Sequence, residues 1–216
     1  MNLPRPSICR PRVEGDREQQ IRDATAEVLV EVGYDRLTMD AVAKAAQASK
    51  ATLYRRWETK ASLVLDTLCT LKAGPEAPVD TGSLRGDLVA AFGTPTGFVN
   101  DKALTIFASV LTAITTDEEL AAGFRERFLG PKLAVSREIY ARAKARGEIR
   151  ADLDLDLLEP ALPGIVLHRS IVLGEPPTRD LVIRIIDEII LPAATRAVPE
   201  PSEPVEPSEP AEPATT

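Results

Sequence analysis

The spacing of the apolar residues is the feature that most limits how this chain of 216 residues can fold. Val, Ile and Thr do not alternate with polar residues over any sustained stretch, as they would in half-buried strands. Apolar side chains recur instead at three- and four-residue intervals, as they do on the buried face of a helix. The first of these stripes consists of Ile21, Ala24, Val28, Leu29 and Val32. The spacing therefore predicts an all-α protein that requires no strand.

Residues that begin or end helices divide the chain further. Gly33 is expected to end the first helix, and the hydroxyl groups of Thr38, Ser49 and Thr59 are expected to cap the next three. Further helices are predicted over residues 83–93, 101–115, 118–128, 132–146, 157–173 and 180–191. Gly130–Pro131 should separate two of them, because proline interrupts a helix.

Composition divides the chain into four segments. Residues 1–15 are expected to form a flexible basic arm, and residues 197–216, which repeat Pro, Glu and Ser, a disordered tail. Between them, residues 16–73 should form a first helical module and residues 80–196 a second, independent helical layer. The tail is either a passive solvated segment or an acidic segment that competes with an anionic partner of the basic module.

Charge is distributed unevenly between these segments. Residues 1–60 hold 11 Lys and Arg against 9 Asp and Glu, a net charge of +2. Residues 61–216 hold 15 against 24, a net charge of −9. Only the first part is therefore expected to meet phosphate groups.

Several classes of protein are excluded by what the sequence lacks. No run of 18 apolar residues could span a membrane, and no apolar stretch follows the basic residues near the start to form a signal-peptide core. We therefore expect a cytoplasmic protein. Cys9 and Cys69 lie 60 positions apart, so neither a disulfide nor a metal site is expected.

Catalysis has little support in the sequence. His168 is the one histidine, the serines lack a nucleophile motif, and neither a glycine-rich phosphate loop nor paired metal ligands occur. We therefore expect no enzymatic activity, no cofactor and no bound metal. His168 follows an apolar stretch and precedes Arg169, so it is either a hydrogen-bonded histidine of an interior or interface, or a contact for a ligand.

Two short helices joined by Gln47-Ala48-Ser49 match the helix-turn-helix arrangement, in which the second helix enters the major groove of DNA. On that second helix only Leu53 has to face the interior, and Trp57 marks its end. The exposed face would then carry Lys50, Ala51, Tyr54 and Arg55. The alternative is a solvated amphipathic helix whose aromatic residues pack in a core, an interpretation that applies best to Trp57.

The residue types on this face suit contact with DNA. Arg55 offers two parallel donors to a guanine edge, and Lys50 can reach a guanine or a phosphate. Ala51 and Thr52 are small enough to let the helix lie deep against a thymine methyl group. Hydroxyl, ammonium and free backbone amide groups are suited to phosphates. Such groups are predicted at Thr38, Tyr54 and Lys60.

The run LTMDAVAKAAQASKATLYRRWETKASLV, preceded by a helix ending in VGYDR, resembles the DNA-binding domain of the tetracycline-repressor (TetR) family of bacterial transcriptional regulators. The resemblance implies a homodimer of all-helical subunits, with a three-helix DNA-binding domain followed by a domain for ligand binding and dimerisation. By position, it assigns phosphate contacts to Thr38, Tyr54 and Lys60, and groove contacts to Lys50, Ala51, Thr52 and Arg55. Family members often have Gly where Gln47 stands. A positive φ at Gln47 would cost on the order of 1 kcal/mol relative to Gly.

The last two predicted helices, residues 157–173 and 180–191, are apolar around more of their surface than one bundle face requires. Pairing with their copies in a second subunit would bury that surface, and the resemblance implies the same arrangement. We therefore expect a homodimer that forms through these two helices.

The middle helices carry large apolar side chains that could line either a dry core or a cavity. The resemblance favours a cavity for a small, largely apolar effector, which the sequence does not identify. The candidate ligand-binding residues are Phe98, Phe107, Leu111, Phe124, Phe128 and His168.

These features together predict a ligand-responsive DNA-binding transcriptional regulator. It is expected to act as a repressor that binds a palindromic double-stranded operator as a dimer and is released by a small apolar effector. The alternative is a helical dimeric adaptor protein without specific DNA binding.

Overall fold

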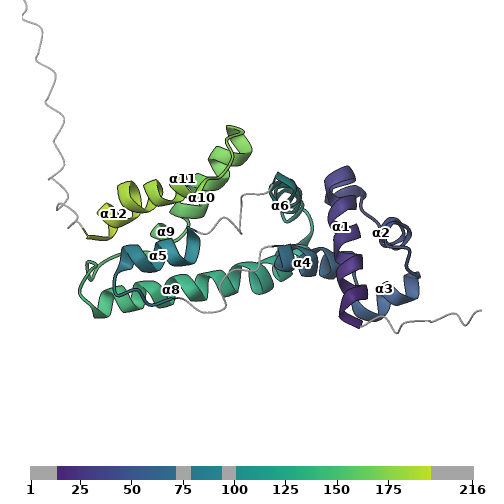
Figure 1. Cartoon of the computed structure of the whole chain (residues 1–216), viewed down its shortest axis with the longest axis horizontal. Coiled ribbons are helices and arrows are strands. Elements are labelled where there is room, and N and C mark those ends of the chain that lie inside the picture. Colours follow the sequence, from purple (N-terminus) through teal and green to yellow (C-terminus); the bar gives the residue numbers. More distant parts are fainter. Residues whose placement is uncertain (1–13, 72–78, 94–100, 196–216) are drawn as a thin grey trace, which may run out of the picture.

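The computed structural model of the chain describes residues 14–71, 79–93 and 101–195, and these residues form helices joined by turns and short loops (Figure 1). No strand occurs in these ranges, and the predicted all-α fold is confirmed. The predicted tail at 197–216, Phe98, and residues 1–13 of the predicted arm lie outside the described residues. The first helix begins at Glu14, so the last two residues of the predicted arm are helical.

In chain order the elements are α1 (Glu14–Arg36), α2 (Met39–Ala45), α3 (Lys50–Arg56), α4 (Lys60–Leu71), α5 (Leu84–Phe92), α6 (Asp101–Ala113), α7 (Glu118–Gly123), η2 (Phe124–Leu129), α8 (Gly130–Ala145), α9 (Leu155–Leu158), α10 (Ala161–Leu167), η3 (His168–Val172), α11 (Arg179–Ile185), η4 (Ile186–Ile190) and α12 (Leu191–Thr195). The three η segments are π-helical turns: η2 and η4 join the helices on either side of them, and η3 continues α10 and ends it at Val172.

The predicted helix caps are present. The side-chain oxygens of Thr38, Ser49 and Thr59 each accept a hydrogen bond at 3.1 Å from the backbone amide three residues further on. These bonds satisfy amides that a helix start leaves unpaired. Gly33 has φ of 73°, so the helical path is interrupted at the predicted position and the chain turns toward α2.

The predicted separation at Gly130–Pro131 is wrong, because residues 118–145 run as one continuous helical segment. The backbone amide of Gly130 donates to the carbonyl of Arg125, five residues earlier, and Gly130 itself has helical angles of −51° and −52°. A π-helical turn shifts the hydrogen-bond register by one residue. Pro131, which has no amide to donate, follows this shift at the start of α8 and does not break the helix.

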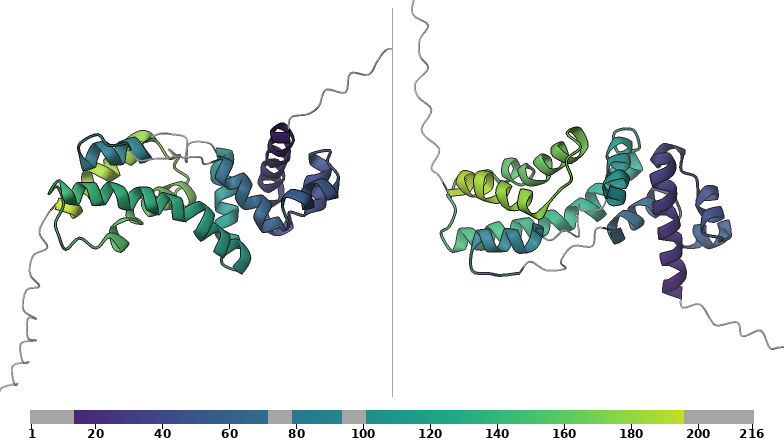
Figure 2. Two further views of the ribbon diagram at one scale, coloured as in Figure 1. Left: turned by 90° about the horizontal axis from the view of Figure 1, so that it is seen from below. Right: turned by 45° about the horizontal axis from the view of Figure 1, so that its top comes forward.

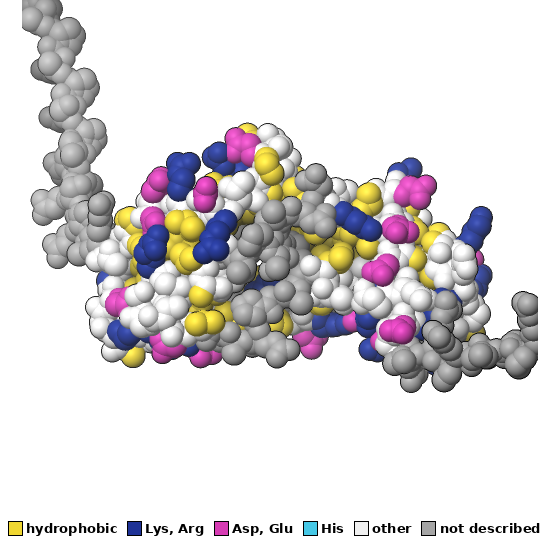
Figure 3. Space-filling model, viewed as in Figure 1, with side chains coloured by type: hydrophobic (Ala, Val, Ile, Leu, Met, Phe, Trp, Pro, Cys, Tyr) yellow, Lys and Arg dark blue, Asp and Glu magenta, His cyan; other side chains and the backbone are white. Residues whose placement is uncertain are grey.

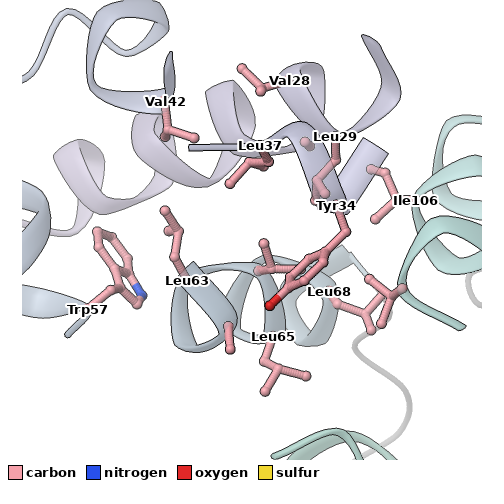
Figure 4. Packing of buried hydrophobic residues seen from close by; sticks show 14 of the residues in the cluster. Val28, Leu29, Tyr34, Leu37, Val42, Trp57, Leu63, Leu65, Leu68 and Ile106 are labelled. Atoms are coloured by element: carbon pink, nitrogen blue, oxygen red, sulfur yellow. The ribbon is translucent and has the colours of Figure 1, made fainter. Parts of the chain in front are cut away.

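The first core cluster joins the helix-turn-helix module to the middle of the chain. Figure 4 shows part of this cluster, in which Ile106 of α6 lies with Leu29 and Tyr34 of α1 and Leu68 of α4. Phe124 also belongs to it. The prediction that residues 80–196 form an independent layer is therefore wrong. A small three-helix module buries only part of its apolar surface alone, and α6, α7 and η2 cover the rest.

A second core cluster forms at the opposite end of the molecule, between α5, α8 and α10–α12. Asp87 of α5 is buried there and accepts hydrogen bonds from the amide and hydroxyl of Thr81, both at 2.7 Å, and from Arg146, which directly follows α8, at 3.1 Å. Burial opposes the charged form of Asp87, but these hydrogen bonds outweigh it and hold its pKa below the usual value.

The molecule is elongated, as two further views make clear (Figure 2). Helices α1, α2 and α3 form one end, α12 lies at the other, and α4 and α8 connect them. Among the described helices, none combines the length and the apolar composition needed to cross a lipid bilayer.

Candidate nucleic-acid interface

The turn between α2 and α3 brings the two helices together as the sequence predicts. Gln47 has φ of 51°, the one non-glycine residue with positive φ in the described part of the chain. Its side chain is exposed, and the amide of Ala48 closes the turn on the carbonyl of Ala43 at 2.8 Å. Gln47 therefore holds a left-handed conformation that glycine adopts more readily, at a cost of about 1 kcal/mol.

Helix α3 has one buried anchor and one open face. Leu53 is fully buried, whereas Lys50, Ala51, Tyr54 and Arg55 are exposed, with 51% of the Tyr54 surface accessible. Three of the four predicted groove-reading residues therefore lie on one surface, together with Tyr54, which is predicted to contact a phosphate. The fourth, Thr52, is half-buried.

The end of α3 is fixed by a polar network around the buried Trp57. The indole N–H of Trp57 donates to Oδ2 of Asp66 on α4 at 3.0 Å, and Nε of Arg22 on α1 donates to the same oxygen at 2.8 Å. Arg22 also pairs with Glu18 at 3.0 Å, and Glu18 pairs with Arg56 of α3 at 3.0 Å. Burial pushes the pKa of Asp66 upward, but the hydrogen bonds from Arg22 and Trp57 outweigh it and lower the pKa.

Lys50 and Arg55 differ in the partners they have in the free chain. Nζ of Lys50 lies 2.7 Å from Oδ2 of Asp40 in the first turn of α2, and this hydrogen bond raises the pKa of Lys50. Arg55 is exposed and makes no ion pair or hydrogen bond within residues 14–71, 79–93 and 101–195. The hydroxyl of Thr52, which is half-buried, bonds to that of Ser49 at 2.8 Å.

The predicted phosphate-binding residues lie in different environments. Thr38 is exposed at the start of α2 and Tyr54 is exposed on α3. Lys60 is half-buried: its Nζ donates to the carbonyl of Tyr34 at 3.2 Å and lies 4.0 Å from the centre of the Tyr34 ring. Contact between Lys60 and a phosphate would require the ammonium group to leave both.

Three polar contacts at the boundary with the middle helices were not predicted from the sequence. The amide of Tyr34 donates to Oγ of Ser109 at 2.7 Å, and its hydroxyl donates to Asp117 at 2.5 Å. The hydroxyl of Thr59 donates to Glu119 at 2.6 Å. All three join residues at least 60 positions apart, so no local sequence pattern could have identified them.

The predicted ligand-binding aromatics form a packed group. Phe107, Phe124 and Phe128 are buried, with ring centroids 4.9–6.0 Å apart, and the half-buried Leu111 packs against the same core. His168 does not join them, because it is exposed at the start of η3.

Two hollows of the described surface lie elsewhere. One, of about 330 Å³, lies between α1 and the end of α2, and the acidic side chains of Asp23 and Glu27 contribute to its wall. The other, of about 470 Å³, is lined by residues of the α3–α4 segment and by Glu119, Gly123 and Arg127. In the described ranges, no group of three or more His, Cys, Asp or Glu residues could hold a metal ion.

Two short helices, α2 and α3, bury their inner faces and turn small and cationic side chains outward. This arrangement defines a helix-turn-helix protein. The chain matches the family model described as "Bacterial regulatory proteins, tetR family" over residues 21–67. It also matches the model described as "Tetracyclin repressor-like, C-terminal domain" over residues 78–189.

Individual relatives agree with these matches. The HTH-type transcriptional regulator Rv1556 of Mycobacterium tuberculosis is 40% identical over 181 residues, which cover 84% of this chain and 89% of that protein. The DNA-binding transcriptional repressor TetR of Mycobacteroides abscessus is 35% identical over 166 residues, 76% of this chain and 87% of that protein. The crystal structure of the TetR family transcription regulator SCO0332 superposes with a TM-score of 0.58 at 28% identity, covering 84% of this chain and all of that one.

The chain therefore belongs to the TetR family of bacterial transcriptional regulators. It is an HTH-type, DNA-binding regulator, and DNA is its partner. Members of the family are regulators and not enzymes, so the family assignment confirms the prediction that the chain has no enzymatic function.

Proposed function

We propose that the protein is a repressor that binds a palindromic operator as a homodimer and leaves it when a small apolar effector binds. The observation that carries the proposal is the outward face of α3, where Lys50, Ala51, Tyr54 and Arg55 are exposed around the buried anchor Leu53. The Mycobacteroides abscessus relative is named as a DNA-binding transcriptional repressor, which supports repression over activation.

Within this interface the residues have different tasks. Arg55, exposed and without an intramolecular partner in the described residues, reads a guanine edge through two donors. Lys50 exchanges Asp40 for a base or a phosphate, and Ala51 and Thr52 allow close approach to the groove floor. Thr38, Tyr54 and Lys60 hold phosphates, and Lys60 gives up the carbonyl of Tyr34 to do so.

The proposed dimer forms through the last two helical segments. Large apolar side chains are exposed there, and hydrophobic side chains reach the surface over α10, α11 and α12 in Figure 3. The large apolar residues exposed in these segments are Leu157 of α9, Ile171 and Val172 of η3, Leu173 just after η3 and Ile189 of η4, which are 42–75% exposed. A twofold axis through this surface would present two copies of α3 to successive major grooves, about 34–36 Å apart.

The proposed effector binds among the middle helices, near Phe107, Leu111, Phe124 and Phe128, with Phe98 as a further candidate; His168, exposed at the start of η3, lies apart from this group. Phe107 and Phe124 belong to the core that also holds α1 and α4. A ligand inserted beside these rings would bind most tightly to a conformer with a different spacing of α6 and α7 from α1. Such differential affinity is what shifts a population away from the DNA-bound state.

A second candidate is a dimeric adaptor that does not recognise a DNA sequence. The observation in its favour is that Lys50 and Lys60 are both engaged within the chain, with Asp40 and Tyr34. The repressor is the better supported function, because Arg55 and Tyr54 remain exposed on the same face.

The test is sequence-specific binding by the full chain. Duplexes are selected from a random 40-base-pair library and used in fluorescence-anisotropy titrations at fixed salt. Tyr54→Ala and Lys50→Ala should weaken binding to a selected duplex about tenfold or more, as expected for 1.4 kcal/mol or more per contact. Arg55→Ala should in addition relax the base preference. Lys144→Ala, at the far end of the molecule, is the charge-matched control. Equal, weak binding of every variant to all duplexes would favour the adaptor.

A further inference from the structure

One carboxylate beside the second core cluster is buried without an adequate partner. The side chain of Glu159, directly after α9, is 4% exposed, and its Oε1 accepts no hydrogen bond from the residues that the structure describes. Its Oε2 lies 4.0 Å from Nε of Arg137 on α8. The Arg137 side chain is 63% exposed, and a pair of this kind contributes little. Because buried charges are ordinarily paired and hydrogen-bonded, Glu159 has room for a further partner.

Tyr140 of α8 places a second polar group near this carboxylate. Its ring is buried in the second core cluster, and its hydroxyl makes no hydrogen bond within the described ranges. Burial and then the negative charge of Glu159 raise the pKa of Tyr140 to about 12. Tyr140 therefore lies within electrostatic range of Glu159, although the two side chains are not hydrogen-bonded to each other.

The residues next to Glu159 are apolar, and the helix before it is short. Leu158 is buried in the second core cluster, and Leu162 of α10 packs against the same cluster. The one turn of α9 has little helical stability of its own, and α9 approaches α8 less closely than α5 does. We therefore expect the contact between α9 and α8 to open more readily than the rest of this cluster.

We propose that Glu159 and Tyr140 bind an organic cation, a protonated amine on an apolar body, between α8 and α9. The ammonium group donates to Oε1 of Glu159 and lies against the Tyr140 ring, and the apolar body packs against Leu158 and Leu162. An ammonium group is attracted both to a carboxylate and to the face of an aromatic ring, and both attractions strengthen where water is excluded. A metal ion fits less well, because the described ranges offer no group of three carboxylate, histidine or cysteine ligands.

This site is separate from the group of rings at Phe107, Phe124 and Phe128. Those rings belong to the first core cluster, whereas Tyr140 belongs to the second. The two sites also differ in chemistry, because the rings offer an apolar surface and Glu159 offers a charge. The inference therefore goes beyond the proposed effector and does not depend on operator binding.

The experiment uses the full chain and three probes of similar size: 2-phenylethylammonium, neutral 2-phenylethanol and anionic phenylacetate. Isothermal titration calorimetry at pH 7 measures the dissociation constant of each. Glu159→Gln removes the buried charge, and Glu138→Gln removes an exposed carboxylate from α8 as its control. Arg137→Gln removes the exposed cation beside Glu159, and Arg125→Gln removes an exposed arginine of η2 as its control.

We expect the unaltered chain and Glu138→Gln to bind the ammonium probe about tenfold or more tightly than the alcohol, with phenylacetate the weakest. Glu159→Gln should bind the ammonium probe about tenfold more weakly than the unaltered chain and should bind the alcohol unchanged. Arg137→Gln should bind the ammonium probe about two- to fivefold more tightly than Arg125→Gln does, because a competing surface charge is gone. Without a probe, Glu159→Gln should raise the urea concentration at the midpoint of unfolding, because it removes a buried charge.

Three results would overturn the inference. Equal affinity of the unaltered chain for the ammonium probe and the alcohol would show that no carboxylate receives the cation. Equal affinity of Arg137→Gln and Arg125→Gln for the ammonium probe would place the cation elsewhere, and this comparison holds even if Glu159→Gln does not fold. A lower midpoint of unfolding for Glu159→Gln, with unchanged binding of the ammonium probe, would assign Glu159 to a structural contact. No DNA is present in these measurements, so their outcome is distinct from that of the operator titrations.

Discussion

The hydroxyl of Tyr34 donates a hydrogen bond to Oδ2 of Asp117 over 2.5 Å and so joins the end of α1 to the start of α7. Asp117 also caps α7, because its Oδ1 accepts from the amide of Leu120 at 2.9 Å. The Leu120 amide and then the Tyr34 hydroxyl lower the pKa of Asp117, whereas burial raises the pKa of Tyr34. One carboxylate therefore orders both a helix start and the boundary between the two parts of the chain.

Tyr34→Phe should lower the free energy of unfolding by about 1.5–3 kcal/mol, the range for a hydrogen bond to a charged group. The ring stays buried in the variant, so the loss reports the hydroxyl alone. The check is urea denaturation at neutral pH. Tyr54→Phe is the matched control, since Tyr54 is exposed, and it should change stability by less than about 0.5 kcal/mol. Equal effects of the two changes would contradict the role assigned to the Tyr34 hydroxyl.

Stability should also depend on pH through Asp66. Its pKa is lower in the folded chain than the usual value, which is about 3.9 in an unfolded chain. The stabilisation is therefore complete above about pH 4 and is lost as pH falls through the folded pKa. Asp66→Asn should lower the free energy of unfolding at pH 7 by about 1–3 kcal/mol, because Arg22 loses a charged partner.

Urea titrations between pH 3 and 7 test this dependence. The difference between the unaltered chain and Asp66→Asn should narrow toward low pH, because the native carboxyl group becomes protonated there. Asp23→Asn, at an exposed carboxylate of α1, should leave the slope with pH unchanged. A gap between Asp66→Asn and the unaltered chain that stays constant over the whole range would refute the assignment.

The local part of this fold could be predicted from the sequence, because short-range chemistry determines it. The caps at Thr38, Ser49 and Thr59, the stop at Gly33 and the inward position of Leu53 all depend on residues within one turn of each other. The outward face of α3 follows from the same periodicity, since only one buried residue fixes its orientation.

The side-chain contacts that join distant segments of the chain could not be predicted from the sequence. Asp40 gives no sign in the sequence that its carboxylate meets Lys50, and Tyr34 gives none that it meets Asp117. The continuity of the helix through Gly130 was missed for a different reason. A π-helical turn depends on the packing of buried side chains such as Phe124 and Phe128, whereas Gly–Pro alone is typical of a break.

The turn of the helix-turn-helix offers a prediction of opposite sign. Gln47→Gly should raise the free energy of unfolding by about 0.5–1 kcal/mol, because glycine adopts a φ of 51° without steric cost. The bond from Arg17 is kept, since it ends on the backbone carbonyl. Thermal and urea unfolding measure the change. Ala45→Gly, two residues earlier on an exposed helical position, should instead destabilise by about 1 kcal/mol. Destabilisation by both would show that φ at Gln47 stores no strain.

Gly123 allows α7 to lie close against α4. A methyl group added there would overlap Cδ1 of Leu65, whose side chain is buried and has little room to move. Gly123→Ala should therefore destabilise the protein by about 1–3 kcal/mol. Gly15→Ala is the control, because a methyl group at Gly15 meets no atom within 4 Å. If Gly123→Ala is as stable as this control in urea, the contact is not close in solution.

The proposed dimer predicts that one charge can separate the subunits. Val172 is 67% exposed at the end of η3, and Val172→Glu would place a carboxylate in an apolar interface. In sedimentation equilibrium, the dimer dissociation constant of Val172→Glu should be at least tenfold higher than that of the unaltered chain. The variant should also bind a duplex with two half-sites more weakly. Val79→Glu changes a valine before α5 that is 52% exposed and should leave the dimer intact. A dimer equally stable in both variants would exclude this surface.

The unbroken helical segment from Glu118 to Ala145 has a mechanical consequence. Its first residues touch α4, and its last turns are tied to α5 by Arg146 and Asp87. A helix of this length measures about 42 Å, so a tilt of one degree at either end displaces the other by on the order of 0.7 Å. A small rotation of the segment where it packs against α4 therefore displaces its other end, beside α5, by about half the length of a covalent bond.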